Sequence, residues 1–155
     1  GYGKIGKKIH TLLKVFKPNI IINDIKKISK KKTPLNNLLK ISDIIFIACD
    51  LNKTSKHLIK MKELKIMKKQ AILINISRGP IIDNAALIKA LKRNLISCAG
   101  LDVYETEPIE KNSELRKLDN CIYTSHNAFN SKETIDRINS LSIKNLINHL
   151  KLFKD

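Results

Sequence analysis

Short apolar runs alternate along the chain with segments in which apolar residues recur every three or four positions. The runs have the length of buried strands, and the periodic segments have one apolar face, as amphipathic helices do. Strand and helix signals in alternation are typical of βαβ units, which build a parallel sheet covered by helices. The pattern therefore predicts an α/β fold. The expected strands lie at 19–23, 43–49, 71–75, within 97–103 and at 121–124, and the expected helices at 5–16, 34–40, 61–67, 84–92 and 131–153.

A glycine-rich turn opens the first helical segment, with Gly1, Gly3 and Gly6 in the spacing GxGxxG. In dinucleotide-binding folds two of these glycines let the backbone turn tightly and approach a pyrophosphate, and the third lets the helix pack closely. The helix N-terminus then offers its N–H groups to the phosphates. GxGxxG alone also occurs in ordinary turns. Here, however, Asp24 follows the run 19–23, where an acidic residue binds the ribose 2′-hydroxyl of NAD, so the two signals together predict a dinucleotide site.

No apolar run precedes Gly1 in the sequence. In a dinucleotide fold of strand order 3-2-1-4-5-6, the strand before the glycine turn is the central one. We therefore expect a Rossmann-type doubly wound parallel sheet that lacks its first, central strand, between 19–23 on one side and 43–49 or 71–75 on the other. Residues 1–155 are expected to be a dinucleotide-binding domain that is partial at its N-terminus. Because unpaired strand edges invite aggregation, the chain alone is expected to fold poorly and to bind NAD weakly.

Polar residues of complementary type follow three of the expected strands. Arg78 follows 71–75, Glu107 lies beyond 97–103, and His126 comes after 121–124. The carboxyl ends of parallel strands are where α/β folds place their ligands. A guanidinium fork suits a carboxylate, and an imidazole exchanges protons near neutral pH. These three residues are the candidate catalytic group, and the other histidines are interpreted as structural or surface residues: His10, His57 and His149.

The sequence resembles the D-isomer-specific 2-hydroxyacid dehydrogenases along essentially its whole length. The resemblance rests on Gly-Tyr-Gly-Lys-Ile-Gly at 1–6, Ile-Asn-Ile-Ser-Arg-Gly at 74–79, Gly-Leu-Asp-Val-Tyr-Glu-Thr-Glu-Pro at 100–108 and Thr-Ser-His-Asn-Ala-Phe at 124–129. It implies hydride transfer between NAD and a small D-2-hydroxy or 2-oxo acid, and an upstream substrate domain that is absent from this chain. The implied catalytic residues are Arg78, Glu107 and His126. The implied cofactor-binding residues are Gly1, Gly3, Lys4, Ile5, Gly6, Asp24, Cys49, Ile76, Ser77, Arg78, Asp102 and His126, and no metal is implied.

Two departures from the family pattern bear on the substrate. Ser125 stands where many members have Pro before the histidine, which could loosen the loop without removing the chemistry. The sequence His-Asn-Ala-Phe at 126–129 replaces the His-Ile-Gly-Gly of phosphoglycerate enzymes, which disfavours phosphoglycerate. Members that act on formate have Gln at the position of Glu107, so formate is disfavoured too. The identity of the 2-hydroxy acid stays open.

The net charge of +16 makes a nucleic-acid partner one alternative. Only four of the 30 basic residues are arginine, and the dense block 26–32 has no aromatic residue for base stacking. A solvated lysine surface is therefore the better interpretation. A second alternative is an NAD-binding regulatory relative that turns over no substrate. It stays open because such a protein would retain the same residues.

Three cysteines, Cys49, Cys98 and Cys121, lie in or beside apolar runs without CxxC spacing. This pattern favours buried, reduced thiols over a disulfide framework or a zinc site. No apolar run approaches the roughly 20 residues that span a bilayer, and the first residues lack the pattern of a signal peptide. We therefore expect a cytoplasmic protein without a membrane partner. We also expect a homodimer in the full-length form.

Overall fold

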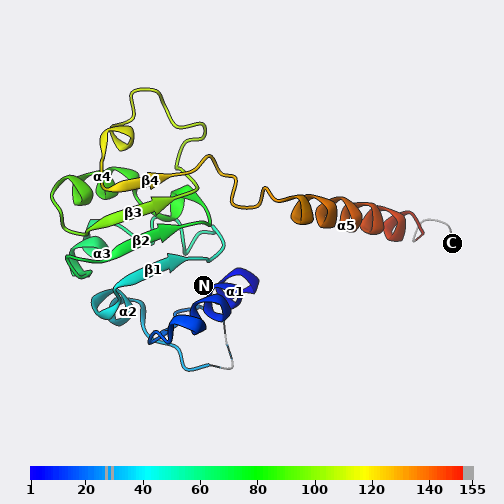
Figure 1. Ribbon diagram of the computed structural model, residues 1–155, viewed down its shortest axis with the longest axis horizontal. Coiled ribbons are helices and arrows are strands. Elements are labelled where there is room, and N and C mark those ends of the chain that lie inside the picture. The colour runs from blue at the N-terminus through cyan, green and yellow to red at the C-terminus, as the bar shows by residue number, and fades with distance from the viewer. Residues whose placement is uncertain (27, 29, 152–155) are drawn as a thin grey trace. The chain divides into compact units, whose positions relative to one another are not determined.

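The computed structural model describes residues 1–26, 28 and 30–151 (Figure 1). It divides into two compact units, Gly1–Ser125 and the part of the chain from His126 onward. The first unit contains a parallel sheet in which each strand pairs with the next one along the chain. This arrangement confirms the expected α/β class and four of the five expected strands. They are β1 (Ile44–Ile47), β2 (Ile72–Asn75), β3 (Cys98–Leu101) and β4 (Cys121–Tyr123).

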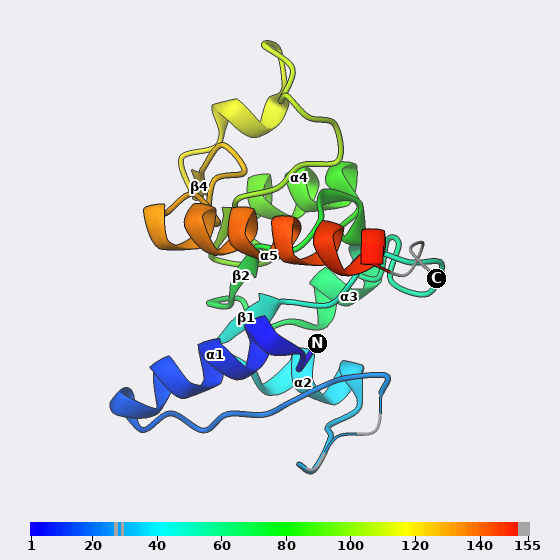
Figure 2. The same cartoon turned by 90° about the vertical axis from the view of Figure 1, so that its right-hand side faces the viewer.

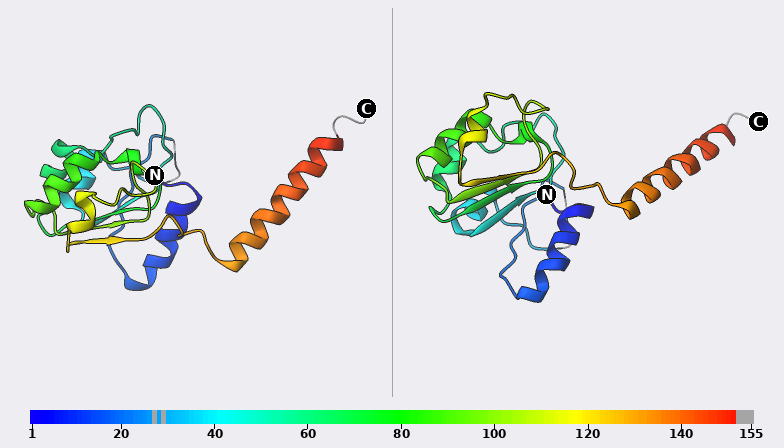
Figure 3. Two further views of the ribbon diagram at one scale, coloured as in Figure 1. Left: turned by 90° about the horizontal axis from the view of Figure 1, so that it is seen from above. Right: turned by 45° about the horizontal axis from the view of Figure 1, so that its top comes forward.

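The expected helices are confirmed, with shifts of a few residues at their ends. In the first unit, α2 packs against α3 and α3 packs against α4 beside the sheet (Figure 3). Residues 152–153 of the expected last helix lie outside the described residues, as do Lys27 and Ser29 of the lysine-rich block. The helices are α1 (Lys4–Leu13), α2 (Leu35–Ile41), α3 (Met61–Ile66), α4 (Asn84–Lys92) and, in the second unit, α5 (Lys132–Lys151).

One face of the sheet forms the core of the first unit. Burial alternates along the strands, and the in-register pairing collects the buried positions into rows: Ile45, Leu73 and Ala99, then Ile47, Asn75 and Leu101. On the opposite face, Ile44 is 51% exposed and Ile122 is 75% exposed. The sheet is therefore half-covered in this chain, although parallel sheets normally bury both faces.

The expected buried strand at 19–23 is wrong. The structure assigns no strand there, and of these residues Ile22 alone is buried. The carbonyl of Ile22 accepts the N–H of Thr33 at 2.7 Å, and the side-chain amide of Asn23 donates to the carbonyl of Thr33 at 2.9 Å. A strand needs a repeated ladder with a neighbouring backbone, and these are isolated bonds. The apolar run is real, but it has no strand to pair with in the described part of the chain.

Gly1 lies between this segment and the end of β1. Its amino group donates to the carbonyl of Asn23 at 2.9 Å. A Cβ added to Gly1 would lie 2.6 Å from the carbonyl oxygen of Ala48. β1 is an edge strand of the sheet, whereas β2 is paired on both sides. Of the two segments expected beside the missing central strand, 43–49 therefore still has a free edge and 71–75 does not. Helix α1 begins directly after the glycine turn, near the end of β1 (Figure 2).

The second unit contains α5, which begins after Ser131. The Ser131 hydroxyl accepts the N–H of Thr134 at 3.2 Å and so caps the first turn. Among residues 1–26, 28 and 30–151, no helix combines the length and apolar character needed to cross a bilayer.

The cysteines differ in burial more than expected. Cys121 is buried, and burial raises the pKa of its thiol to about 11. Cys49 and Cys98 are only half-buried, so the expectation of buried thiols is wrong for these two. Cys98 lies on the less covered face of β3, and Cys49 lies beyond β1, where the sheet meets the glycine turn. All three are free thiols.

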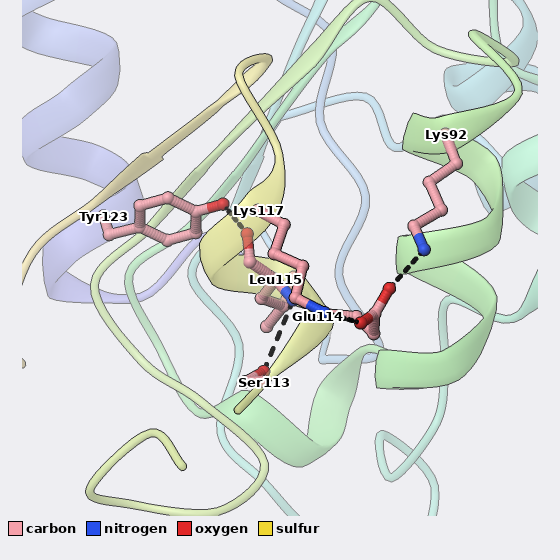
Figure 4. A network of polar contacts seen from close by, with 6 residues as sticks. All are labelled: Lys92, Ser113, Glu114, Leu115, Lys117 and Tyr123. Carbon is pink, nitrogen blue, oxygen red and sulfur yellow. Dashed lines mark hydrogen bonds and ion pairs between the residues drawn. The ribbon is translucent and has the colours of Figure 1, made fainter. Parts of the chain in front are cut away.

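A polar network joins the end of α4 to the segment before β4 (Figure 4). The Glu114 carboxylate accepts from the ammonium groups of Lys117 and Lys92, which hold its pKa at about 2. The hydroxyl of Tyr123 donates to the carbonyl of Leu115, and burial raises the pKa of that phenol. The Glu114 ion pairs thus attach the short helical turn Glu114–Lys117 to α4.

Replacing Glu114 with Gln should lower the melting temperature slightly at neutral pH. The pKa of Glu114 is depressed in the folded state, so its contribution is fully present above its ordinary value of 4.5 and is lost as the pH falls through about 2. The effect should be small because the group is exposed, and high salt should reduce it. Thermal unfolding of the two proteins should differ most at neutral pH and converge near pH 2. A difference in melting temperature that does not change with pH would show that the ion pairs of Glu114 are not its cause.

Candidate active site

The loops that leave the carboxyl ends of the strands are linked to one another. Gly1 packs against Ala48 and Cys49, just beyond β1. The Ser77 hydroxyl, beyond β2, donates to the carbonyl of Cys49. Gly79 packs against the backbone beyond β3. The glycine turn and these loops therefore form one continuous edge, the place where parallel α/β sheets bind ligands.

The glycine turn packs tightly at Gly6 and is open at Gly3. Gly3 immediately precedes α1, and a Cβ added to it would meet nothing within 4 Å. A Cβ added to Gly6 would lie 2.4 Å from the carbonyl oxygen of Gly1, so the helix packs on the turn only with glycine there. Lys4 and Ile5 form the start of α1, and both are exposed. The open side at Gly3 lets a phosphate approach the helix N-terminus.

Asp24 faces this turn. Its carboxylate accepts the N–H of Tyr2 at 2.6 Å and the N–H of Lys26 at 2.7 Å. Burial raises the pKa of Asp24, but the hydrogen bonds from Tyr2 and Lys26 outweigh it and hold the pKa below its ordinary value. The side chain is therefore an anion that joins the predicted ribose position to the glycine turn.

Arg78 is exposed on a loop whose backbone is held by the side chain of Asn75, the last residue of β2. Asn75, 1% exposed, donates from its amide to the carbonyl of Arg78 at 3.0 Å and accepts the N–H of Ser77 at 3.1 Å. The Arg78 guanidinium donates to the carbonyl of Ser77 at 2.7 Å. That bond uses one of its five donors, so the planar fork can still receive a carboxylate.

The loop with Glu107 lies directly against the loop with Arg78. A Cβ added to Gly79 would lie 1.8 Å from the carbonyl carbon of Tyr104, so the two backbones touch. Glu107 is exposed, and its Oε1 accepts the N–H of Tyr104 at 2.9 Å. The structure therefore brings Arg78 and Glu107 onto adjoining loops, as the sequence predicted.

Three further predicted residues line the same edge. Asp102, 5% exposed, accepts from the Thr124 hydroxyl and donates its N–H to the carbonyl of Asn75 at 3.1 Å. Ile76 is half-buried between β2 and Ser77. Cys49 is half-buried, and burial raises the pKa of its thiol. Asp102 thus fastens the end of β3 to the ends of both neighbouring strands.

His126 is the first residue of the second unit. Its backbone has a positive φ of 54°, which is uncommon for residues other than glycine but is more frequent for histidine. Its imidazole makes an edge-to-face contact with Phe129 at 6.5 Å between ring centroids. Unusual backbone of this kind gathers at functional sites.

Several residues of this edge were missed by sequence reasoning. Asn75 fixes the Arg78 loop, and a buried amide at the end of an apolar strand could have indicated it. Gly79 was recognised as part of a motif but not as a contact between loops. His57 was interpreted as structural or surface, yet its Nε2 lies 2.7 Å from Oε1 of Glu105. No local pattern in the sequence indicates that pair.

The chain is similar to known proteins in family profile, in sequence and in structure. The profile of the family described as D-isomer specific 2-hydroxyacid dehydrogenase, NAD binding domain, matches residues 1–128. A glyoxylate reductase of Pyrococcus horikoshii is 41% identical over 154 residues, which are 95% of this chain and 46% of that protein. The chain therefore spans about half the length of the curated relatives it matches.

Solved structures give the same result. A D-lactate dehydrogenase from Sporolactobacillus sp. matches 100% of this chain and 52% of its own with a TM-score of 0.91 and 29% identity. A D-lactate dehydrogenase from Aquifex aeolicus, complexed with NAD and lactic acid, matches 97% of this chain and 52% of its own with a TM-score of 0.89 and 28% identity.

Proposed function

Because this chain belongs to the D-isomer-specific 2-hydroxyacid dehydrogenases as their NAD-binding domain, we propose that its protein transfers a hydride between NAD(H) and a small D-2-hydroxy or 2-oxo acid. One observation supports the proposal most. An exposed guanidinium, Arg78, and an exposed carboxylate, Glu107, lie on two loops whose backbones touch at Gly79. A guanidinium and a carboxylate are the two groups that the proposal requires at the edge that also holds the glycine turn.

Each catalytic residue has a distinct role in this proposal. NAD, when bound, accepts or supplies the hydride. Arg78 binds the substrate carboxylate and polarises the oxygen on C2. His126 gives that oxygen a proton or removes one from it. Glu107 holds the other imidazole nitrogen of His126, fixes the tautomer and favours the imidazolium.

The cofactor-binding roles follow the same edge. Gly3 and the start of α1 would receive the pyrophosphate, and Asp24 would accept bonds from the ribose hydroxyls. Asp102 would bind the carboxamide at the nicotinamide end. The remaining residues would form the walls of the cofactor cleft: Gly1, Lys4, Ile5, Gly6, Cys49, Ile76, Ser77, Arg78 and His126.

The function is tested by assaying the full-length gene product with NADH against a panel of 2-oxo acids, glyoxylate and pyruvate included. Oxidation of NADH with at least one of them is the expected result. Binding of NADH without turnover of any acid would favour the regulatory alternative. Binding of nucleic acid with an affinity that falls steeply with salt, and no turnover, would favour the third interpretation.

The protein should prefer NADH to NADPH. The Asp24 anion would repel a 2′-phosphate, whereas it accepts a bond from a 2′-hydroxyl. Lys26 could offset this repulsion, because its backbone N–H donates to Asp24 at 2.7 Å and its charge also lowers the pKa of that carboxyl. Titration of the full-length gene product with both cofactors measures the preference, and Asp24→Asn should reduce it. NADPH binding as tight as NADH binding would contradict the role of Asp24.

We also propose that the full-length protein is a cytoplasmic homodimer. Closed two-fold dimers are by far the commonest form among homo-oligomeric proteins. Its mass in solution tests this part of the proposal, and a monomer at micromolar concentration would contradict it.

A further inference from the structure

Glu105 is held from two sides at the edge that contains Arg78 and Glu107. Its Oε1 lies at hydrogen-bond distance, 2.7 Å, from Nε2 of His57, and its Oε2 accepts the N–H of Asn84 at 3.3 Å. His57 follows β1, Asn84 begins α4 after β2, and Glu105 follows β3. One carboxylate, two residues before Glu107, therefore joins segments that leave three different strands.

His57 also holds the Arg78 loop through its backbone. Its φ is 49°, in the left-handed region that histidine and asparagine tolerate better than most residues. In this conformation its N–H donates to the carbonyl of Pro80 at 2.8 Å. Pro80 lies two residues after Arg78 in the chain. The backbone of His57 thus fixes one loop while its imidazole fixes the other.

The contact between His57 and Glu105 limits how far the Arg78 loop and the Glu107 loop can separate. The side chains of His57 and Glu105 are 31% and 34% exposed, so water screens the pair less than it screens a fully exposed one. A Cβ added to Gly79 would lie 2.3 Å from the backbone nitrogen of Glu105. The backbone contact at Gly79 and the contact between His57 and Glu105 therefore set the separation of the Arg78 loop and the Glu107 loop.

We propose that His57 and Glu105 are a positioning pair that holds the Arg78 loop and the Glu107 loop at the separation that the reaction requires. Neither residue is a catalytic residue in this proposal, because each acts through the loop to which it is attached. The inference rests on the proposed function, which assigns Arg78 to the substrate carboxylate and Glu107 to His126.

Two substitutions break the pair with little other change. In His57→Asn, the new residue tolerates the positive φ, but its amide is too short to reach Glu105. In Glu105→Gln, the size is kept, but one acceptor oxygen and the charge are lost, so the side chain cannot accept from both His57 and Asn84 at once. In the full-length gene product, each single variant should lower kcat/KM for the 2-oxo acid about 10-fold, and the double variant should also lose about 10-fold, because the residues act as a unit. The affinity for NADH should change less than about 2-fold.

The matched control is the ion pair between Asp43 and Lys68. It has the same distance, 2.7 Å, but lies at the amino ends of β1 and β2, away from the proposed site. Asp43→Asn should leave kcat/KM within about 2-fold of wild type. If Asp43→Asn lowered kcat/KM as much as Glu105→Gln does, the loss would not be specific to the contact between His57 and Glu105.

A second measurement, hydrogen exchange, tests the positioning role of His57 and Glu105 and does not depend on catalytic activity. The N–H of Tyr104 donates to Glu107, so its hydrogen exchange reports whether the Glu107 loop is held. Hydrogen exchange at the N–H groups of Tyr104 and of position 57 should be about 10-fold faster in both single variants and unchanged in Asp43→Asn. Unchanged exchange, or losses of kcat/KM that multiply in the double variant, would overturn the positioning pair. Absence of turnover in the wild type would contradict the proposed function instead, and the exchange rates would still decide the pair.

Discussion

Replacing His126 with Ala is expected to lower the rate of 2-oxo acid reduction by roughly 10² to 10⁴, the range for removal of a general acid–base group. The affinity for NADH should change little, because the imidazole acts on the substrate oxygen and not on the phosphates or the ribose. The loss should therefore appear in kcat and in kcat/KM to similar extents. Steady-state kinetics and a separate NADH titration of the full-length gene product provide both values.

His149→Ala is the control for this experiment. His149 lies on α5, in the same unit as His126 but far along the chain from the motif at 124–129. Its removal should leave the rate within about 2-fold of wild type. Near-normal turnover of His126→Ala would show that another group exchanges the proton.

Gly79→Ala should have the largest structural effect of any single methyl group added to this edge. The new Cβ would lie 1.8 Å from the carbonyl carbon of Tyr104 and 1.9 Å from its oxygen. Both atoms belong to the backbone, so the loops must separate. We expect a loss of about 3 kcal/mol in the free energy of unfolding and a melting temperature lower by roughly 10 °C. Turnover should fall about 100-fold as well, since a displacement near 1 Å misplaces Arg78 relative to Glu107.

Gly100→Ala tests the same change where there is room for it. A Cβ on Gly100 would lie 3.7 Å from the nearest atom of the Ile74 side chain, an ordinary contact. The variant should keep the stability and turnover of wild type within about 0.5 kcal/mol and 2-fold. If Gly79→Ala behaved like Gly100→Ala, the two loops would not touch as described.

The sequence predicts best what depends on neighbouring residues along the chain. The apolar stripe of 84–92 and the run 71–75 have local causes, side-chain periodicity and burial, and both elements appear within a residue of their expected bounds. The run 19–23 has the composition of a strand, but pairing is a contact with another segment. That contact cannot be read from the run itself, so this prediction was wrong.

The same distinction applies to the candidate site. The sequence singles out Arg78, Glu107 and His126 because each follows an expected strand, and the structure places Arg78 and Glu107 on adjoining loops. The contacts that fix these residues join distant positions. His57 and Glu105 are 48 residues apart in the sequence, and Gly79 matters only because Tyr104 lies against it. Geometry between loops therefore had to come from the structure.

The strand order has a consequence for how the chain emerges during synthesis. Each strand of the sheet pairs with the one made just before it: Ile72 with Ile44, Cys98 with Ile72, and Cys121 with Ala99. The sheet can therefore form from its amino-terminal side during synthesis, one strand and one helix at a time. Each of β2, β3 and β4 can pair as soon as it leaves the ribosome, because its partner has already been made. β4 comes last and is the other edge, so until it leaves the ribosome the paired side of β3 stays open to other nascent chains.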